Sequence, residues 1–208
     1  MNGKLVNLYG HYLSIPSCNA GLILSMDGIA HSYQHVDLMK GAKKELSFQA
    51  LNRFAQVTAV VHAKKIIAQS RAILVYLAEQ FAALDGDTEE ERLGVREWLC
   101  WQADRLYNIT WARSQIKFQN GAPAVVEQLQ NASRNALGVL DAHLESVEFV
   151  ACEVPTIADV ASYSMIAHAE DAELDVSDWP AVAARHSRMA ALDGCGDLDE
   201  IMPREDRA

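Results

Sequence analysis

The chain has 208 residues, of which 50% are hydrophobic and 22% are charged, so it can bury a core as one large domain or two modest ones. Its formal net charge of -10 argues against wrapping of nucleic acid, which needs an excess of lysine and arginine. No apolar run approaches the roughly 20 residues that span a bilayer. Residues 1–10 carry no signal-peptide pattern, and the four cysteines form no CxxC pair. We therefore expect a cytoplasmic protein with reduced thiols and no membrane partner.

Strand and helix signals alternate through the first part of the chain. Pro16 suits the first turn of a helix that ends near Gly28, and a second helix begins at Ser70 with a single apolar face. Short β-rich runs separate the helices, which is typical of a compact α/β domain. The predicted strands are 4–9, 32–38, 57–61 and 65–68, and a weak short helix is predicted at 43–51.

An acidic stretch at 84–94 separates this region from an all-helical one. Thr88 followed by Glu91 forms a capping box, so this stretch should lead directly into a helix. A second capping box at Thr156 and Asp159 gives Asp159 a structural role rather than that of a catalytic acid. We predict domains at 1–83 and 89–208, joined by a linker at 84–88. The predicted helices of the second domain are 89–118, 124–145, 157–168 and 181–192.

A group of basic residues lies in the first third of the chain. Two interpretations stay open: a solvated rim, or a basic edge that steers an anionic small molecule. The seven histidines form no HxxxH or HxH pair, so we expect no metal site. The basic residues are Lys40, Lys43, Lys44, Arg53, Lys64 and Lys65.

Several strings, in order, resemble the cytosolic glutathione transferases, in particular serine-type, theta-like bacterial members. They include LYGHYLSIPS at 8–17, QSRAILVYLAEQF at 69–81, PTIADVASY at 155–163 and WPAVAARHSRMAALDG at 179–194. The resemblance covers nearly the whole chain. It implies a thioredoxin-like N-terminal domain followed by an all-α C-terminal domain, a homodimer, and glutathione as co-substrate.

The resemblance also implies which residues hold glutathione. Gln56 would reach its glycine end, and the Val57 backbone would bond its cysteinyl part. Gln69 would reach its ammonium group, and Ser70 its γ-glutamyl carboxylate. Independently of the family, a helix N-terminus favours a carboxylate because its N–H groups are unpaired and partly positive. The structural alternative is that Ser70 is simply an N-cap, worth about 1 kcal/mol.

Ser14 is the catalytic candidate that the resemblance implies. A hydroxyl at this place donates a hydrogen bond to the glutathione sulfur and favours the thiolate, since a free thiol of pKa about 8.5 is mostly protonated at neutral pH. Cys18 could instead form a mixed disulfide, although a small buried apolar role is the better interpretation. Tyr9, Tyr12 and Ser17 are also within plausible reach.

A second substrate needs its own residues. The aromatic residues near the middle of the predicted helix 89–118 are mostly suited to a core. From position alone, Tyr107, Trp111 and Arg113 could line a pocket for a small electrophile.

The sequence departs from the family around the ligand loop. Thr58 stands where the family has a cis-proline, and because a cis bond before another residue costs roughly 2.5–4 kcal/mol, we expect Val57–Thr58 to be trans, with the loop on another path. The alternative is that the surrounding fold forces a strained cis bond, which would itself point to a retained ligand site. Arg53 replaces the proline of an Asn-Pro pair, Gln69 is neutral where a carboxylate often stands, and Gly21 replaces a frequently basic residue.

Three functions remain open at this point. The first is an enzyme that adds glutathione, or a related thiol, to a small and specialised electrophile held between the domains. The second is a non-catalytic dimeric binding or regulatory protein of the same fold that has lost the thiol site. The third is a thiol-disulfide enzyme that acts through Cys18.

Overall fold

The computed structural model describes residues 5–206, so Lys4, with which the first predicted strand begins, lies outside the described residues. The chain folds as two units, one built from residues 5–84 together with 192–206 and the other from Asp85–Ala191. The prediction assigned all of 89–208 to the second unit, whereas the structure groups the last segment with the first.

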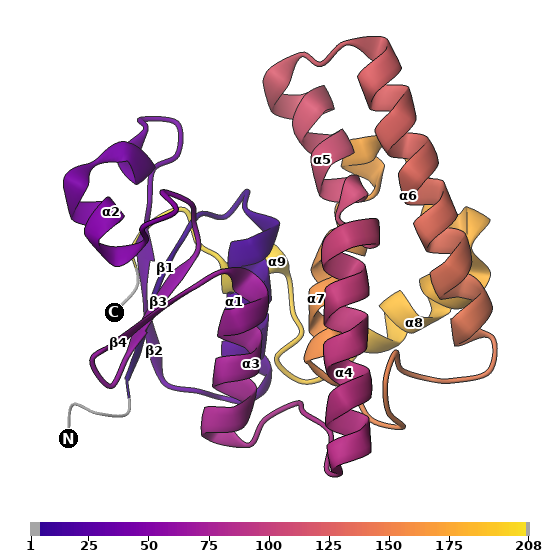
Figure 1. Ribbon diagram of the computed structural model, residues 1–208, viewed down its shortest axis with the longest axis horizontal. Coiled ribbons are helices and arrows are strands. Elements are labelled where there is room, and N and C mark those ends of the chain that lie inside the picture. Colours follow the sequence, from indigo (N-terminus) through magenta and orange to yellow (C-terminus); the bar gives the residue numbers. More distant parts are fainter. Residues whose placement is uncertain (1–4, 207–208) are drawn as a thin grey trace. The chain divides into compact units, whose positions relative to one another are not determined.

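The first unit contains a mixed sheet (Figure 1). Strand β1 (Val6–Gly10) runs parallel to β2 (His31–His35) on one side and antiparallel to β3 (Ala59–His62) on the other. Strand β4 (Lys65–Ala68) pairs with β3, so the order within the described residues is β2-β1-β3-β4. Alternate residues of β1 are buried, so one face of this strand packs in the core and fixes its register.

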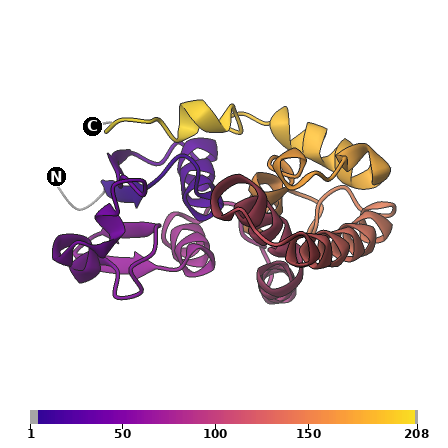
Figure 2. The same ribbon diagram turned by 90° about the horizontal axis from the view of Figure 1, so that it is seen from above.

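Helices cover both faces of this sheet. Helices α1 (Ile15–Met26) and α3 (Ser70–Phe81) pack side by side on one face, and α2 (Leu46–Leu51) lies on the other (Figures 1 and 2). The predicted helix 43–51 is therefore shorter, because a separate 3₁₀ turn, η1 (Ala42–Lys44), precedes α2. The predicted strand 57–61 begins at Ala59, because the residues before it form a loop.

The second unit is helical, as the sequence predicts. Its first helix begins at the predicted capping box, where Thr88 Oγ1 accepts from Glu91 N at 3.1 Å and Thr88 N donates to Glu91 Oε2 at 2.9 Å. The elements are α4 (Glu89–Trp101), α5 (Asn108–Ser114), α6 (Pro123–Leu144), α7 (Ile157–Ile166), the turns η4 (Glu170–Ala172) and η5 (Val176–Asp178), and α8 (Pro180–Ala190).

Two π-helical segments interrupt the helix predicted at 89–118. They are η2 (Gln102–Leu106), between α4 and α5, and η3 (Gln115–Gln119), after α5. A π turn holds an extra residue, and at η2 the fully buried Gln102 side chain donates to the carbonyl oxygen of Ala158 at 2.9 Å. The prediction of one regular helix was wrong here, because apolar spacing does not report a local change in turn length.

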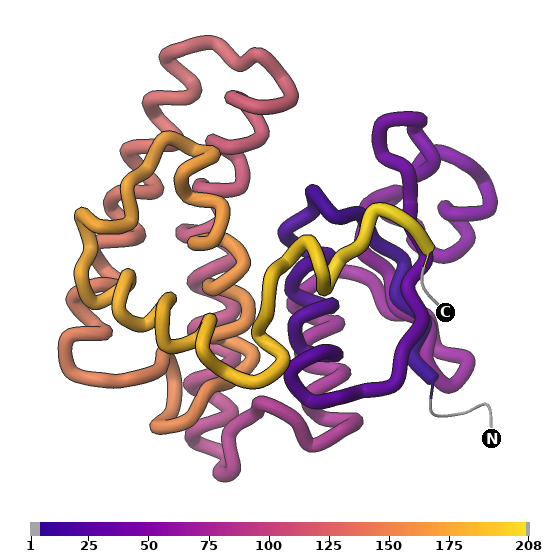
Figure 3. The backbone as a smooth tube through the Cα atoms, turned by 180° about the vertical axis from the view of Figure 1, so that it is seen from behind, coloured from indigo at the N-terminus to yellow at the C-terminus, as the bar shows by residue number. Residues whose placement is uncertain are grey.

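The C-terminal segment carries a short helix that the sequence does not predict, α9 (Leu198–Ile201). It packs on α1, and the neighbouring Met202 is buried. Figure 3 shows this segment, in yellow, running along α1 and on to the sheet. Its packing on α1 is the reason why 192–206 belongs to the first unit.

A buried ion pair holds the centre of the second unit. Asp159 is 0% exposed and Arg185 is 1% exposed. Asp159 Oδ1 accepts from Arg185 Nη2 at 3.0 Å and from Val150 N at 3.0 Å, and its Oδ2 accepts from Thr156 N at 2.9 Å. The structural role predicted for Asp159 is confirmed.

We predict that Asp159→Ala lowers the free energy of unfolding by about 3–5 kcal/mol, because it leaves the Arg185 charge buried without its partner. Urea denaturation measures this change. Glu153→Ala, at an exposed position nearby, should stay within about 0.5 kcal/mol of the parent. Adding Arg185→Met to Asp159→Ala should recover part of the loss; a loss below about 1 kcal/mol for Asp159→Ala alone would contradict the assignment.

Candidate functional site

The strand register brings several loops to one end of the sheet. Tyr9 of β1 lies opposite Ala59 of β3, and Ala59 lies opposite Ala68 of β4. The end of β1, the start of β3 and the end of β4 therefore coincide. This end of the sheet is the loop end. At the loop end lie the sequence-predicted residues Ser14, Gln56, Val57, Gln69 and Ser70.

Ser14 is the N-cap of α1. Its Oγ accepts from Ser17 N at 3.3 Å, and its carbonyl oxygen accepts from Cys18 N at 2.9 Å. A hydroxyl that accepts one hydrogen bond keeps its own hydrogen for donation. Ser14 is partly exposed, so its O–H can serve a ligand at the positive end of α1.

Cys18 and Ser17, the other candidates near Ser14 on α1, are buried and contact the backbone of the preceding loop. Cys18 is 0% exposed, and its Sγ lies 3.8 Å from the carbonyl oxygen of Tyr12. Ser17 is also buried, and its Oγ accepts from His11 N at 3.2 Å. These two side chains therefore hold the loop before α1, and Ser14 is the more accessible of the three.

The loop before β3 is tied to β1 through side chains. Thr58 Oγ1 donates to the carbonyl oxygen of Tyr9 at 2.8 Å. The buried Asn52 side chain donates to the carbonyl oxygens of Gln56 and Thr58. The Val57–Thr58 peptide bond is cis, so the expectation of a trans bond was wrong: these three hydrogen bonds form with the bond in its cis form.

Helix α3 begins one residue earlier than it would if Ser70 were its N-cap. Gln69, with φ of 73°, is the N-cap, and Ser70 is the first residue of the helix. Ser70 is 7% exposed, and its Oγ accepts from Arg71 Nη1 at 3.1 Å. Gln69 Nε2 donates to Gln56 Oε1 at 3.4 Å, which joins the two predicted glutamines.

Helices α1 and α3 begin at the loop end, and no acidic side chain in their described first turns offsets the positive charge of their N-termini. Within the described chain, neither α1 nor α3 has an acidic residue in its first turn. By contrast, α4 has Glu89, Glu90 and Glu91 there. A helix N-terminus carries roughly half a positive charge, so the loop end can receive anionic groups at two places.

Histidine rings complete the loop end and were not singled out from the sequence. His11 stacks on Tyr12 with ring centroids 4.5 Å apart, and it lies 4.9 Å from the ring of His35. Burial, followed by the charge of His35, lowers the pKa of His11 to about 4. Their positions at the ends of β1 and β2 were the signal that could have found them, since Gly10 pairs with His35.

The residues predicted for an electrophile pocket lie in the second unit. The rings of Tyr107 and Trp111 meet edge to face at 5.8 Å, and Trp111 is 51% exposed. Arg113 is buried and its Nε donates to Asp171 Oδ2 at 3.0 Å. Arg113 is therefore committed to an ion pair, whereas Trp111 keeps about half of its surface exposed.

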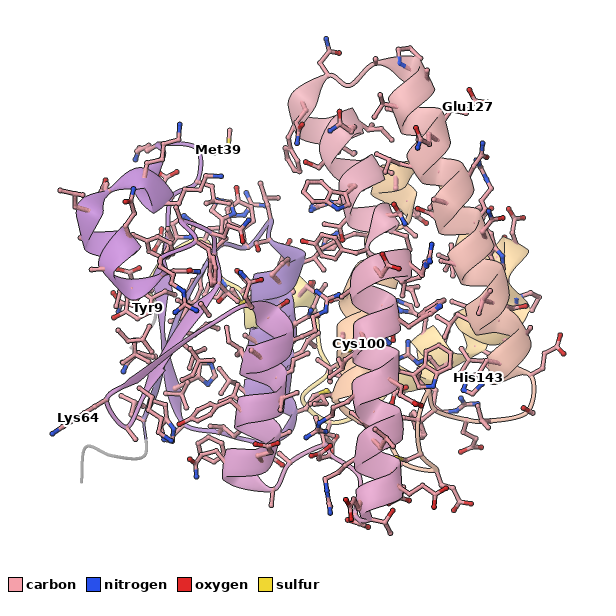
Figure 4. The ribbon with its side chains drawn as sticks, in the orientation of Figure 1. Tyr9, Met39, Lys64, Cys100, Glu127 and His143 are labelled. Carbon is pink, nitrogen blue, oxygen red and sulfur yellow. The ribbon has the colours of Figure 1, made fainter. Side chains whose placement is uncertain are left out.

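The basic residues do not form a single edge. Lys64 and Lys65 lie at the turn between β3 and β4, where His62 pairs with Lys65, at the end of the strands away from the loop end. Figure 4 shows Lys64 at the tip of this turn. Lys40 instead pairs with Asp37 at 3.2 Å. The six basic residues therefore do not all lie together, and the hypothesis that some of them steer an anionic ligand stays a prediction.

Among residues 5–206, no group of three or more His, Cys, Asp or Glu side chains lies together as a metal site would require. Over the same residues, no helix combines the length and the apolar character needed to cross a membrane.

Comparisons with known proteins agree with this architecture. The models "Glutathione S-transferase, N-terminal domain" and "Glutathione S-transferase, C-terminal domain" match residues 5–79 and 103–193. The chain belongs to the glutathione S-transferase family. Its sheet and helical unit are the thioredoxin-like and all-α domains of that fold.

Individual relatives show how close the similarity is. "Glutathione S-transferase F9" of Arabidopsis thaliana is 32% identical over 170 residues, which is 76% of this chain and 77% of that protein. "Disulfide-bond oxidoreductase YfcG" of Escherichia coli is 26% identical over 172 residues, 77% of this chain and 79% of that protein. A glutathione S-transferase structure from Xanthobacter autotrophicus Py2 is 30% identical, with a TM-score of 0.84 and coverage of 94% and 99%.

We predict that the His11 ring stays neutral until the pH approaches about 4. Burial disfavours its charged form, so this ring's contribution to stability is complete above its ordinary pKa near 6.5 and is lost as pH falls toward the folded value. An NMR titration of the ring signals, assigned with His11→Gln, measures the midpoint. The same titration in urea should return the midpoint to about 6.5; a midpoint near 6.5 in the folded protein would contradict the assignment.

Proposed function

We propose that this protein is a glutathione transferase-like enzyme that adds glutathione, or a related thiol, to a small electrophile. The observation that carries the proposal is the strand register, which gathers the Ser14 loop, the 56–58 loop and the start of α3 at the loop end. Family membership supports the class of reaction.

Glutathione binds, in this proposal, along the loop end. Its γ-glutamyl carboxylate lies at the N-terminus of α3, where the Ser70 hydroxyl, the backbone N–H groups and the guanidinium of Arg71 supply donors and positive charge. The Val57 backbone bonds the cysteinyl part. Gln56 and Gln69 serve the glycine end and the ammonium group.

The chemistry requires a thiolate, which the Ser14 hydroxyl stabilises. Its O–H donates to the sulfur, and the N-terminus of α1 adds favourable electrostatics. The thiol proton passes to solvent, and the sulfur lone pair forms a bond to the electrophilic carbon. In a substitution, a leaving group departs with its electron pair. In an addition, the electron pair of a double bond moves onto the neighbouring atom, which then takes a proton from solvent.

The second candidate is a non-catalytic binding protein of this fold. The observation that favours it is that the side chains proposed to bind glutathione bond to neighbouring side chains instead: Arg71 donates to Ser70, and Gln69 donates to Gln56. A ligand would have to replace those two hydrogen bonds. The Cys18 thiol-disulfide alternative is weaker, because Cys18 is fully buried.

The proposed macromolecular partner is a second copy of the chain. The resemblance to the family implies a homodimer, and the first unit exposes several large apolar side chains that a partner surface would cover. These side chains are Met39 at 78% exposure, Leu46 at 84%, Phe54 at 45% and Ile66 at 52%.

Calorimetry tests the binding step. We expect glutathione to bind with a dissociation constant of about 1 mM or tighter, and Ser70→Ala to weaken binding about tenfold or more, since a hydrogen bond to a charged group contributes ~1.5–3 kcal/mol. Ser187→Ala, an exposed serine of α8, is the matched control and should bind as the parent does. Absence of a binding heat at millimolar glutathione would end the proposal.

Substitution of Ser14 tests the chemical step. Ser14→Ala should lower the conjugation rate about 10- to 100-fold and raise the pKa of the bound thiol, because one charge-stabilising hydrogen bond is lost. Stopped-flow absorbance of the thiolate against pH measures both effects with a reactive model electrophile. Cys18→Ser should retain most activity. The reverse pattern, with activity lost only in the Cys18 variant, would favour the thiol-disulfide alternative instead.

A further inference from the structure

The C-terminal segment is fitted closely onto α1 and β1. A Cβ atom added at Gly21 would lie 2.7 Å from Met202 Sδ and 2.8 Å from Ile201 Cγ2. At Gly10, the last residue of β1, it would lie 2.9 Å from Ser17 Cβ and 3.0 Å from Met202 Cε. Met202 is 1% exposed. Two glycines therefore make room for this segment, which fixes where the residues after Met202 can reach.

The residues after Met202 reach the loop end. The guanidinium carbon of Arg204 lies 4.9 Å from the centroid of the Tyr12 ring, a cation–π distance. Asp206 Oδ1 accepts from the backbone N of His35 at 2.7 Å. Tyr12 belongs to the loop between β1 and α1, and His35 is the last residue of β2. The segment thus contacts the loop end at two points.

A short chain of contacts connects these two points to Ser14. The His11 ring lies against the rings of Tyr12 and His35, at 4.5 Å and 4.9 Å between centroids. His11 Nδ1 accepts from Leu13 N at 3.1 Å, and the carbonyl oxygen of His11 accepts from Ser14 N at 2.9 Å. These contacts link Tyr12 and His35 to the backbone that carries the Ser14 hydroxyl.

We propose that the segment Leu198–Asp206 positions the Ser14 loop, and that Arg204 and Asp206 are positioning residues for the thiol chemistry. The expected effect of these residues on the conjugation rate rests on the proposed function, whereas their expected effect on the order of the loop at residues 11–14 does not. Arg204 holds Tyr12 from one side, and Asp206 fixes the end of β2, against which the His11 ring rests. Together they restrict the backbone at residues 11–14.

The chain offers matched variants for a test. A chain that ends at Pro203 keeps α9 and Met202 but lacks both positioning residues. Arg204→Ala and Asp206→Ala remove one contact each, while Arg204→Lys keeps a cation and Asp206→Asn keeps an acceptor oxygen. Glu205→Ala, at an exposed position between the two, is the control.

The first measurement is hydrogen–deuterium exchange of the peptide that covers residues 11–18, which needs no ligand. We expect exchange to be about fivefold faster or more in the chain ending at Pro203 and in Asp206→Ala, with Glu205→Ala unchanged and Asp206→Asn close to the parent. Unchanged exchange in the shortened chain overturns the inference.

The second measurement is conjugation kinetics against pH. We expect Arg204→Ala and Asp206→Ala to lower kcat about fivefold or more, to leave KM for glutathione within about twofold, and to raise the apparent pKa of the bound thiol. The conservative variants should restore the parent profile. A fall in activity without any change in the pH profile or rescue assigns the segment a structural role only, and overturns the kinetic part.

The two proposals fail in distinguishable ways. If the parent protein binds no glutathione, the proposed function falls, and the exchange result alone decides whether the segment holds the loop. If conjugation depends on Ser14, but the Arg204 and Asp206 variants match the parent in hydrogen–deuterium exchange and in kinetics, the inference fails and the proposed function stands.

Discussion

Strand β1 pairs with β2 on one side and with β3 on the other, and the hydroxyl of Thr58 donates a further hydrogen bond to the carbonyl oxygen of Tyr9. This register brings the three loops that we propose for ligand binding to one end of the sheet. Val6 and Leu8 are almost completely buried, and a slip of one residue would turn them to the opposite face. Because that slip is so costly, the loop end is held by the core, and the loops themselves need little internal order.

Two departures from the family pattern acquire a physical reason from the contacts around them. Gly21, where a basic residue is frequent, is the place at which Met202 and Ile201 approach α1. The same segment then carries Arg204 onto Tyr12, so a cation reaches the loop end from the C-terminal segment. Thr58 supplies a hydroxyl donor to the Tyr9 carbonyl, which a proline lacks.

The sequence predicted those elements whose signals are local. The capping boxes at Thr88 and Thr156 marked helix starts, and the apolar face of α3 is buried at Ile73, Leu74 and Leu77 as expected. The π segments and α9 were missed, because a change in turn length and a helix of 4 residues leave no periodic signal.

The candidate site was predictable only in part, for the same reason. Ser14, Gln56, Val57, Gln69 and Ser70 came from the resemblance, and the strand register then places their loops at one end. Asn52 and Arg71 act on those loops through contacts with residues close in sequence, whereas His35 contacts His11 and Asp206, which lie far from it along the chain. A single sequence does not reveal such pairs.

The helix N-termini at the loop end favour anions even though the chain carries a net charge of -10 and the Asp206 carboxylate accepts a hydrogen bond from His35 N at the same end. Exposed charges are screened over about 10 Å at 0.1 M salt, so an anionic ligand responds mainly to its nearest neighbours. At the loop end these include the positive N-termini of α1 and α3, which carry no acidic residue in their described first turns, together with Arg71 beside Ser70. A carboxylate at α3 and a thiolate at α1 would each meet a separate positive end. Since α1 and α3 pack side by side and begin at the same end of the sheet, a ligand that carries both anions a few bonds apart fits this charge pattern better than one that carries a single charge.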